Sequence, residues 1–446
     1  LNQSGEQERK PDAPRFGLSR FRLGHCGDLL VAVLERPQTP ADLTISRFFA
    51  ANRYLGSHDR GFISDAVYGT LRELLRLEFI LGDFLTNAAG ERYVAILLYT
   101  FFTDRGDSID DDTARELLRL SDNEINHARR LLRDAPARID ALPENERIAV
   151  RTSLPIWFVE RVLEQMGMEE GGALLASLSG QAPITLRANT LVANRERLAA
   201  ALAAQNIPST PGLYAPDALL LNRRLNANAI PEFKQGWFEI QDEGSQLLST
   251  ILDPHPNWHV FDACAGAGGK SLHLAAIMKG RGAISAHDIN ERRLMEIRPR
   301  LRRSTAQNVR VMSHDHYLEN RKKLAGMYDA VMIDAPCSGA GVLRRNPGAR
   351  LTFQPAMVDR LTEIQGTILH EYSWLVKPGG LLLYATCSLL REENEAQVER
   401  FLAGNTGWRL ERVNAPEGMI TPEGYFRSFP HRHGTDAFFG ALLRRK

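Results

Sequence analysis

The chain has 446 residues, 43% of them hydrophobic and 24% charged, which is typical of a soluble globular protein with two or three domains. Its 55 lysines and arginines balance 54 aspartates and glutamates, so affinity for a nucleic acid has to come from local basic patches. The four cysteines include no Cys-x-x-Cys pair, which argues against a zinc site or a disulfide framework. No apolar run has the length of a membrane span, so we expect a cytoplasmic protein with reduced thiols, no metal and no membrane partner.

The first part of the chain predicts a helical domain. Residues 1–17 are polar and contain two prolines, so we expect a loosely ordered segment without a signal peptide. From residue 18 to 150, apolar residues recur at helical spacing between polar breaks, which predicts an all-α domain of five to seven helices. The run Asp-Asp-Asp-Thr at 110–113 is suited to cap one of these helices.

Residues 151–255 mix the two kinds of pattern. Apolar spacing predicts helices over 157–166 and 172–178, and the run 184–189 is typical of a strand. We therefore expect a small α+β connector subdomain here.

Strands and helices alternate from residue 256 to 446. Such alternation predicts βαβ units and a doubly wound α/β domain whose sheet is parallel except for one late antiparallel strand. In sheets of this kind, ligands bind at the carboxyl ends of the strands. The predicted strands are 260–263, 283–288, 309–315, 328–334, 380–386, 408–413 and 437–443.

A glycine-rich turn follows the first of these strands, in the stretch VFDACAGAGGKSLHLAA at 260–276. Strand, turn and helix in this order hold an anionic or nucleotide-like ligand against backbone N–H groups. The stretch fails the P-loop pattern because Cys264 replaces the first glycine, and it fails the dinucleotide pattern because Ser271 replaces the third. The plain alternative is a turn that only lets the helix pack closely on its strand.

Polar and sulfur-containing side chains follow the later strands. Asp288 ends the second strand, where a carboxylate either holds the hydroxyls of a ribose or caps the next helix. Asp334 and Cys337 follow the fourth strand, and Cys387 follows the fifth. A lone cysteine is usually a small buried residue, but two at the ends of adjacent parallel strands face one crevice, which favours chemistry. Cys264 is interpreted as mainly structural, with its backbone lining the pocket.

Several separate motifs in this part of the chain occur in a known order. DACAGAGGK at 262–270, DAPCSG at 334–339 and TCS at 386–388 resemble the motifs of the S-adenosylmethionine-dependent RNA cytosine-C5 methyltransferases. The resemblance covers the chain from residue 186 almost to its end. Further matches are LRAN at 186–189, QDEGSQ at 241–246 and DAFF at 436–439.

The helical part resembles one branch of this family, the bacterial 16S ribosomal RNA methyltransferases of the RsmB type, also called Sun or Fmu. That branch has an N-terminal domain similar to the transcription antitermination factor NusB, which RGF at 60–62 and VYGTLR at 67–72 resemble. The resemblance implies three domains after the loose segment 1–17. They are a NusB-like RNA-binding domain over 18–150, the α+β connector over 151–255 and a Rossmann-like methyltransferase domain over 256–446.

The resemblance also assigns catalytic roles. Cys387 is expected to add to C6 of cytosine, Asp334 to hold the N3/N4 edge of the base, and Cys337 to assist removal of the C5 proton. The choice of nucleophile depends on the family, because DNA cytosine methyltransferases use the cysteine of the Pro-Cys motif. The implied cofactor, S-adenosyl-L-methionine, has no phosphate, which explains why both phosphate-binding patterns fail narrowly. Its expected contacts are Cys264, Ala265, Gly266, Ala267, Gly268, Gly269, Lys270, Asp288, Asp315 and Asp334.

The implied partner is RNA, either 16S ribosomal RNA or a small-subunit assembly intermediate, bound by a monomer. The target base has to leave its helix or loop to reach the thiol, so basic side chains should hold the RNA backbone. The arginine-rich stretch 292–303 is either such a surface or a solvated helix face. The predicted RNA contacts are Arg187, Asn189, Arg344 and Arg345, and Pro347 predicts a turn just beyond them.

One departure from the family pattern and three competing functions stay open. Ala267 stands where the family usually has proline, so we expect a more flexible glycine loop. The first competing function is methylation of tRNA or of a different ribosomal cytosine. The second is that of a non-catalytic RNA-binding assembly or antitermination factor. The third is that of a P-loop ATPase, which Cys264 disfavours.

Overall fold

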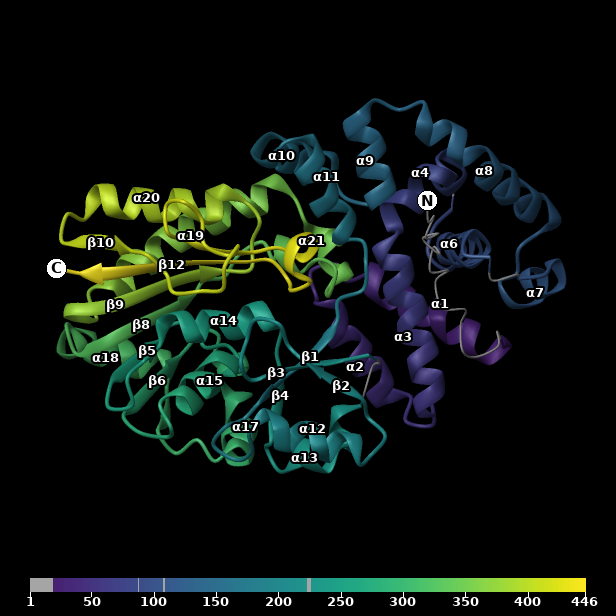
Figure 1. The fold of residues 1–446 in the computed structure, drawn as a ribbon. Coiled ribbons are helices and arrows are strands. Elements are labelled where there is room, and N and C mark those ends of the chain that lie inside the picture. The colour runs from purple at the N-terminus through teal and green to yellow at the C-terminus, as the bar shows by residue number, and fades with distance from the viewer. Residues whose placement is uncertain (1–18, 87, 107–108, 223–225) are drawn as a thin grey trace, which may run out of the picture. The chain divides into compact units, whose positions relative to one another are not determined.

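The computed structural model describes residues 19–86, 88–106, 109–222 and 226–446 (Figure 1). The segment 1–17, predicted to be loosely ordered, lies outside the described residues. The chain divides into two compact units. The first extends to Leu163 and includes the later segment Asn346–Phe353, and the second contains Glu164–Arg345 and Gln354–Lys446. The division into domains at residues 150 and 255 stays a prediction.

The described part of the first unit consists of helices and the loops between them, as the helical spacing predicts, but it contains more helices than the five to seven expected. Its core contains the buried apolar faces of α1, α3, α4 and α6. The helices are α1 (Arg20–Leu34), α2 (Ala41–Ala51), α3 (Ser57–Arg72), α4 (Leu74–Leu81), α5 (Asp83–Thr86), α6 (Glu91–Asp104), α7 (Asp111–Leu117), α8 (Asp122–Asp140) and α9 (Glu144–Thr152), and α10 (Ile156–Met166) begins there.

Two of these helices begin where side chains satisfy their first N–H groups. Asp110 caps α7 by accepting a hydrogen bond from the Thr113 N–H, which confirms the predicted cap. Ser121 and Glu124 form a capping box at the start of α8. Short polar residues between the apolar runs therefore set where these helices begin.

The segment Asn346–Phe353 joins the helical unit through a buried arginine. The predicted turn at Pro347 is a 3-10 helix, η3 (Pro347–Thr352), whose Arg350 side chain is buried. Its guanidinium donates to the carbonyl oxygens of Arg72, at the end of α3, and of Ser153, just past α9, the latter at 2.9 Å. Burial lowers the pKa of Arg350 to about 9. The guanidinium thus supplies donors to carbonyls that these helix ends leave unsatisfied.

Arg350→Met should destabilise the helical unit by about 2–3 kcal/mol, because the substitution keeps the aliphatic volume but leaves buried carbonyls without their donors. Hydrogen exchange of peptides from α3 and α9 measures the effect. The same substitution at the exposed Arg36 is the control and should leave exchange unchanged. If these peptides are equally protected from exchange in the two variants, the hydrogen bonds of Arg350 do not stabilise the helical unit.

The second unit contains two sheets. The smaller is antiparallel, with the order β2-β3-β1-β4, and its strands pack against α12 around a small apolar core. The predicted strand at 184–189 is β1, and the two predicted helices are α10 and α11. The elements are α11 (Met168–Ser177), β1 (Ile184–Ala188), α12 (Arg195–Ala203), β2 (Ser209–Pro211), β3 (Ala218–Leu221), η1 (Ala227–Ala229), α13 (Pro231–Lys234) and β4 (Phe238–Ile240).

The larger sheet has the order β10-β12-β9-β8-β5-β6-β7, and β11 pairs with β12. Strands β7, β6, β5, β8 and β9 pair in parallel, and β12 runs antiparallel to β9, β10 and β11. The predicted late antiparallel strand is therefore confirmed. The strands are β5 (His259–Asp262), β6 (Ala283–His287), β7 (Val309–Met312), β8 (Tyr328–Asp334), β9 (Val376–Thr386), β10 (Trp408–Glu411), β11 (Phe426–Ser428) and β12 (Phe438–Arg445).

Helices cover both faces of this sheet because its strands are apolar on both sides. In β8, Ala330 and Met332 enter one core while Val331 and Ile333 enter the other. The first core contains α14 to α17 and the second contains α18 to α20. The helices are α14 (Glu243–Leu252), α15 (Gly269–Ile277), α16 (Glu291–Met295), α17 (Ile297–Ser304), α18 (His314–Leu324), η2 (Ala340–Val342), α19 (Pro355–Ser373), η4 (Arg391–Glu393), α20 (Glu395–Gly404) and α21 (Pro430–His433).

This doubly wound arrangement is the predicted Rossmann-like architecture, and it brings the ends of β5, β6, β8 and β9 to one edge. Across the described residues, the helices include none whose length and hydropathy suit a membrane span.

Candidate functional site

The glycine loop between β5 and α15 needs its glycines. Gly266 and Gly268 have φ values of +52° and +81°, in the region that side chains rarely adopt. A Cβ at Gly268 would lie 2.2 Å from Cγ1 of Ile297, whereas a Cβ at Gly269 would meet nothing nearer than an arginine nitrogen at 3.6 Å. The loop therefore brings its backbone close to α17.

Arginines hold this loop where the family usually has a proline. Arg300 Nη1 donates to the carbonyl oxygen of Ala267 at 2.8 Å, and Arg187 Nη1 donates to that of Gly269 at 2.7 Å. Arg300 is fixed in turn by Glu239, at 2.8 Å. These bonds restrain the loop in place of the proline ring, so its expected flexibility has no support here.

Three carboxylates surround the loop. Asp262 accepts a hydrogen bond from Ser271 Oγ at 2.6 Å, Asp288 accepts one from the Gly266 N–H at 2.8 Å, and Asp334 pairs with Lys270 Nζ at 2.5 Å. Burial raises the pKa of Asp262 to about 7. Its Oδ1 is buried without a hydrogen-bond partner in the protein. This set of acceptors suits a ligand that carries hydroxyl groups and positive charge, as S-adenosyl-L-methionine does, and disfavours a triphosphate.

The structure separates the two predicted aspartates that follow β6 and β7. Asp288 is not the cap of α16, because Asn290 accepts the capping hydrogen bond from the Arg293 N–H. The carboxylate of Asp288 instead ties the glycine loop to the end of β6. Asp315 is exposed in the first turn of α18. A contact of Asp315 with the adenine ring stays a prediction.

Gly268→Ala should weaken S-adenosyl-L-methionine binding at least about 10-fold and destabilise the protein by about 2–3 kcal/mol, since the added Cβ strains the turn and displaces Ile297. Titration calorimetry and denaturant unfolding measure the two effects. Gly269→Ala is the matched control, because that position has room for a Cβ. If both variants bind equally well, the shape of this loop does not determine the binding.

The two predicted catalytic cysteines meet in the structure. Cys337 Sγ and Cys387 Sγ are 3.4 Å apart, and both side chains are partly exposed. The Gly341 N–H donates to the carbonyl oxygen of Cys387 at 2.9 Å, so the two loops are also joined through their backbones. The hydrogen bond with Cys387 and burial raise the pKa of the Cys337 thiol. Thus Asp334 is the last residue of β8, and the two thiols follow the ends of β8 and of the neighbouring β9.

Three of the four predicted RNA contacts are wrong, because their side chains are buried. Arg187 is 1% exposed, and Asn189 donates from Nδ2 to the carbonyl oxygens of Gly236 and Ser304 at 2.8 and 2.9 Å. Burial lowers the pKa of Arg187 to about 10. Together these two residues tie β1 to the loop that carries the glycines and to α17. Their role is structural.

Arg344 and Arg345 lie in a buried ionic cluster. Arg344 Nε and Arg345 Nε donate to the two oxygens of Asp436 at 2.7 and 2.6 Å, and Arg345 also pairs with Asp242 at 3.1 Å. Arg344 is the third wrong RNA contact, since its side chain is 7% exposed. Arg345 keeps an exposed portion, so its contact with RNA stays a prediction. The cluster joins the segment after Cys337 to two motifs that are distant in sequence.

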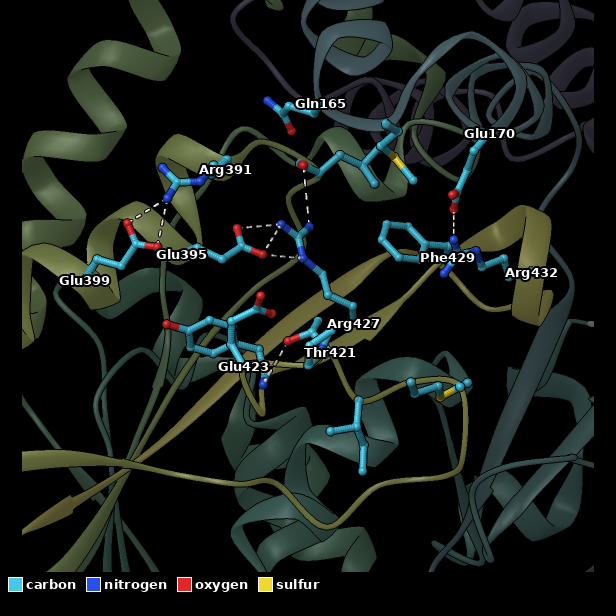
Figure 2. Close-up of a pocket in the computed structure, with 17 residues that line it drawn as sticks. Gln165, Glu170, Arg391, Glu395, Glu399, Thr421, Glu423, Arg427, Phe429 and Arg432 are labelled. Atoms are coloured by element: carbon cyan, nitrogen blue, oxygen red, sulfur yellow. Dashed lines mark hydrogen bonds and ion pairs between the residues drawn. The ribbon is translucent and has the colours of Figure 1, made fainter.

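A surface pocket of about 640 Å³ lies elsewhere in the second unit (Figure 2). Its charged side chains pair with one another, as Arg427 does with Glu395 at 2.7 Å and Arg391 with Glu399 at 2.7 Å. None of the predicted catalytic or cofactor residues lines it. We assign no ligand to this pocket. Within the described ranges, no group of three or more His, Cys, Asp or Glu side chains is arranged to hold a metal ion.

The sequence interpretation missed Glu393, whose buried carboxylate bonds to the residues that follow both cysteines. The only signal in the sequence is that a serine follows each cysteine, at 338 and 388. Glu393 itself lies in the charged run REENE at 391–395, which is typical of a solvated helix start.

Comparison with known proteins gives consistent results. Residues 249–444 match the family model for the 16S rRNA methyltransferase RsmB/F, and residues 154–228 match the RsmF/B-like ferredoxin-like domain. The chain is 30% identical over 438 residues to the "Probable ribosomal RNA small subunit methyltransferase B" of Synechocystis sp., covering 94% of this chain and 98% of that protein. It is 30% identical over 410 residues to ribosomal RNA small subunit methyltransferase B of Vibrio cholerae, covering 89% and 92%. The crystal structure of PH0851 superposes with a TM-score of 0.80 at 25% identity, covering 96% of this chain and all of that one.

Proposed function

The chain belongs to the RsmB/F family of 16S ribosomal RNA methyltransferases, and we propose that it converts a cytosine of 16S ribosomal RNA to 5-methylcytosine through a covalent bond between Cys387 and the base. S-adenosyl-L-methionine is the cofactor. The observation that carries the proposal is the pair of thiols 3.4 Å apart at the ends of β8 and β9. Asp334 is the last residue of β8, just before the loop of Cys337, and is 32% exposed, so it is accessible to a substrate.

Cytosine needs a nucleophile at C6 because its C5 carbon is too electron-poor to take a methyl group directly. When the Cys387 thiolate adds to C6, the C5=C6 electron pair becomes available at C5. The cofactor supplies an electrophilic methyl group, which C5 accepts. Loss of the C5 proton then restores the double bond and expels the Cys387 thiolate.

Cys337 and Asp334 act on protons of the same base. Cys337 lies beside Cys387, so it is placed to assist removal of the C5 proton and release of the enzyme, as the family resemblance implies. Asp334 accepts a hydrogen bond from the N4 amino group of cytosine, and Lys270 holds the Asp334 carboxylate in place. These assignments follow the family resemblance, and the geometry is compatible with them.

Exposed arginines on the second unit are the best candidates for holding RNA. In the stretch 292–303, Arg300 and Arg303 pair with Glu239, whereas Arg292, Arg298 and Arg302 are exposed. Some arginines of this stretch are therefore held in ion pairs with Glu239, and the others form an exposed basic surface. We propose that the exposed members contact the phosphate backbone and that the helical unit, as a NusB-like domain, adds a second RNA contact.

The test is transfer of tritiated methyl from S-adenosyl-L-methionine to unmodified 16S ribosomal RNA, followed by nucleoside analysis. The proposal requires label in 5-methylcytidine at a single position. Transfer RNA and 23S ribosomal RNA are the control substrates. Preferential labelling of either control would assign the enzyme to another RNA, and RNA binding without any label would favour a non-catalytic assembly factor.

A further inference from the structure

A buried carboxylate connects the two cysteine loops. Ser338 Oγ and Ser388 Oγ both donate to Glu393 Oε2, and these two hydroxyls lie 3.3 Å from each other. The Ser338 N–H and the Gln365 side-chain amide donate to Glu393 Oε1 at 2.8 and 3.0 Å. Both oxygens of a fully buried carboxylate are thus satisfied by donors, which offsets the cost of burying its charge.

Glu393 is itself held by contacts other than the serines. It ends the short helix η4, and its carbonyl oxygen accepts a hydrogen bond from the Tyr384 hydroxyl of β9 at 2.7 Å. The neighbouring Asn394 donates from Nδ2 to the carbonyl oxygen of Ser388 at 3.0 Å. The backbone of Glu393 is therefore held by β9 independently of the bonds between its carboxylate and the two serine hydroxyls.

We propose that Glu393 is a positioning residue that holds both cysteine loops in register, so that the Cys387 and Cys337 thiols face one substrate base at the separation seen here. Because each thiol is on the residue before a bonded serine, a shift of either serine moves the adjacent thiol directly. The inference rests on the proposed function only for its effect on methyl transfer. The effect on the thiols themselves follows from the geometry alone.

The charge of Glu393 adds a second effect. The hydrogen bond with Cys387 and burial are the main causes of the raised pKa of the Cys337 thiol, and the negative charge of Glu393 acts in the same direction. Replacing Glu393 with a neutral residue should therefore lower the pKa of Cys337. The thiol would then react with alkylating agents at lower pH.

The next turn of the chain offers a matched control. Glu395 lies two positions after Glu393 and forms an ion pair with Arg427 at 2.7 Å, on the side of the turn that lines the surface pocket (Figure 2). Arg427 also donates to the carbonyl oxygen of Leu389 at 3.5 Å. Glu395→Gln therefore weakens the ion pair with Arg427 that supports the same turn, but it removes no hydrogen bond to Ser338 or Ser388.

The experiment compares the wild type with Glu393→Gln, Glu393→Asp and Glu395→Gln. Iodoacetamide alkylation of each cysteine is followed by mass spectrometry across a pH series, without RNA, and steady-state methyl transfer gives kcat and KM. For Glu393→Gln we expect alkylation of Cys337 to shift to lower pH and kcat to fall about 100-fold with little change in KM. Glu393→Asp keeps the negative charge, so Cys337 in this variant should be alkylated over the same pH range as in the wild type. Glu395→Gln should match the wild type in both alkylation and kcat.

Two results would overturn the inference. The first is a Glu393→Gln protein whose alkylation profile and kcat match those of Glu395→Gln. The second is a Glu393→Gln protein that loses thermal stability but, while folded, keeps the wild-type kcat and the wild-type alkylation profile of Cys337. The buried Cys26 reports opening of the helical unit, because its alkylation requires the helical core to open. If the wild type fails to methylate RNA, the proposed function fails, while the alkylation profiles still decide the role of Glu393.

Discussion

Replacing Cys387 with alanine should reduce methyl transfer to 16S ribosomal RNA by roughly 10⁴-fold or more, while S-adenosyl-L-methionine binds as in the wild type. The alanine removes the only atom that adds to C6, so the C5 carbon stays unreactive. The glycine loop and its carboxylates are bonded to other partners and should be unaffected. Tritium transfer measures the rate and titration calorimetry measures cofactor binding.

The control for this variant is Cys26→Ala, the same substitution in the core of the helical unit. It should retain methyl transfer. A Cys387→Ala protein with more than about one tenth of wild-type activity would assign the nucleophile to another residue. Cys337 would be the candidate, because its sulfur is the neighbouring thiol at 3.4 Å.

Replacing Cys337 with alanine should give a different result, an accumulated covalent complex between protein and RNA. In the proposed reaction Cys387 forms its bond to C6 without help from Cys337, but the bond breaks only as the C5 proton leaves and the thiolate is protonated. Without the second thiol, addition outpaces release. Denaturing gel electrophoresis with labelled RNA should detect a complex that survives heating in detergent.

The double variant Cys337→Ala, Cys387→Ala is the control for trapping and should form no complex. A single Cys337→Ala variant that turns over as fast as the wild type without an adduct would remove Cys337 from the reaction. An adduct that persists in the double variant would show that neither cysteine forms the bond.

The sequence predicts most of the catalytic sheet because most of its strands carry a strong local signal. Apolar runs such as 328–334 are buried on both faces, and the residues with reactive side chains follow them directly. Parallel strands place their carboxyl ends at one edge, so the meeting of Cys337 and Cys387 could be expected from their positions alone. β11 was missed because it has three residues and no such run.

The RNA contacts were predicted poorly because ion pairing over long sequence distances leaves no local signal. Arg187 looks like a surface residue in the sequence, yet its bonds to Gln241 and to the carbonyl oxygen of Gly269 make it part of the core. Arg344 finds its partner at Asp436, far along the chain. A single sequence does not reveal which charges pair, so both arginines resemble nucleic-acid contacts.

The segment around Arg350 and the residue Glu393 escaped prediction for related reasons. The segment Asn346–Phe353 follows the Pro-Cys loop in sequence but packs with the helical unit. A local sequence pattern does not show that a short segment leaves one unit to pack with the other. Glu393 lies in a run of charges that resembles a solvated surface, although it is fully buried. Its four donors come from three separate segments of chain.

The most direct test of the central claim is to incubate the wild-type protein with S-adenosyl-L-methionine and 16S ribosomal RNA that contains 5-fluorocytidine in place of cytidine. Fluorine at C5 cannot leave as a proton does, so the reaction should stop after methyl transfer with the base still bonded to the protein. Mass spectrometry of the digested complex should identify the peptide that contains Cys387, joined to a methylated fluorocytosine. A crosslink at Cys337, or methylation of ordinary RNA without any trapped complex, would contradict the proposed reaction.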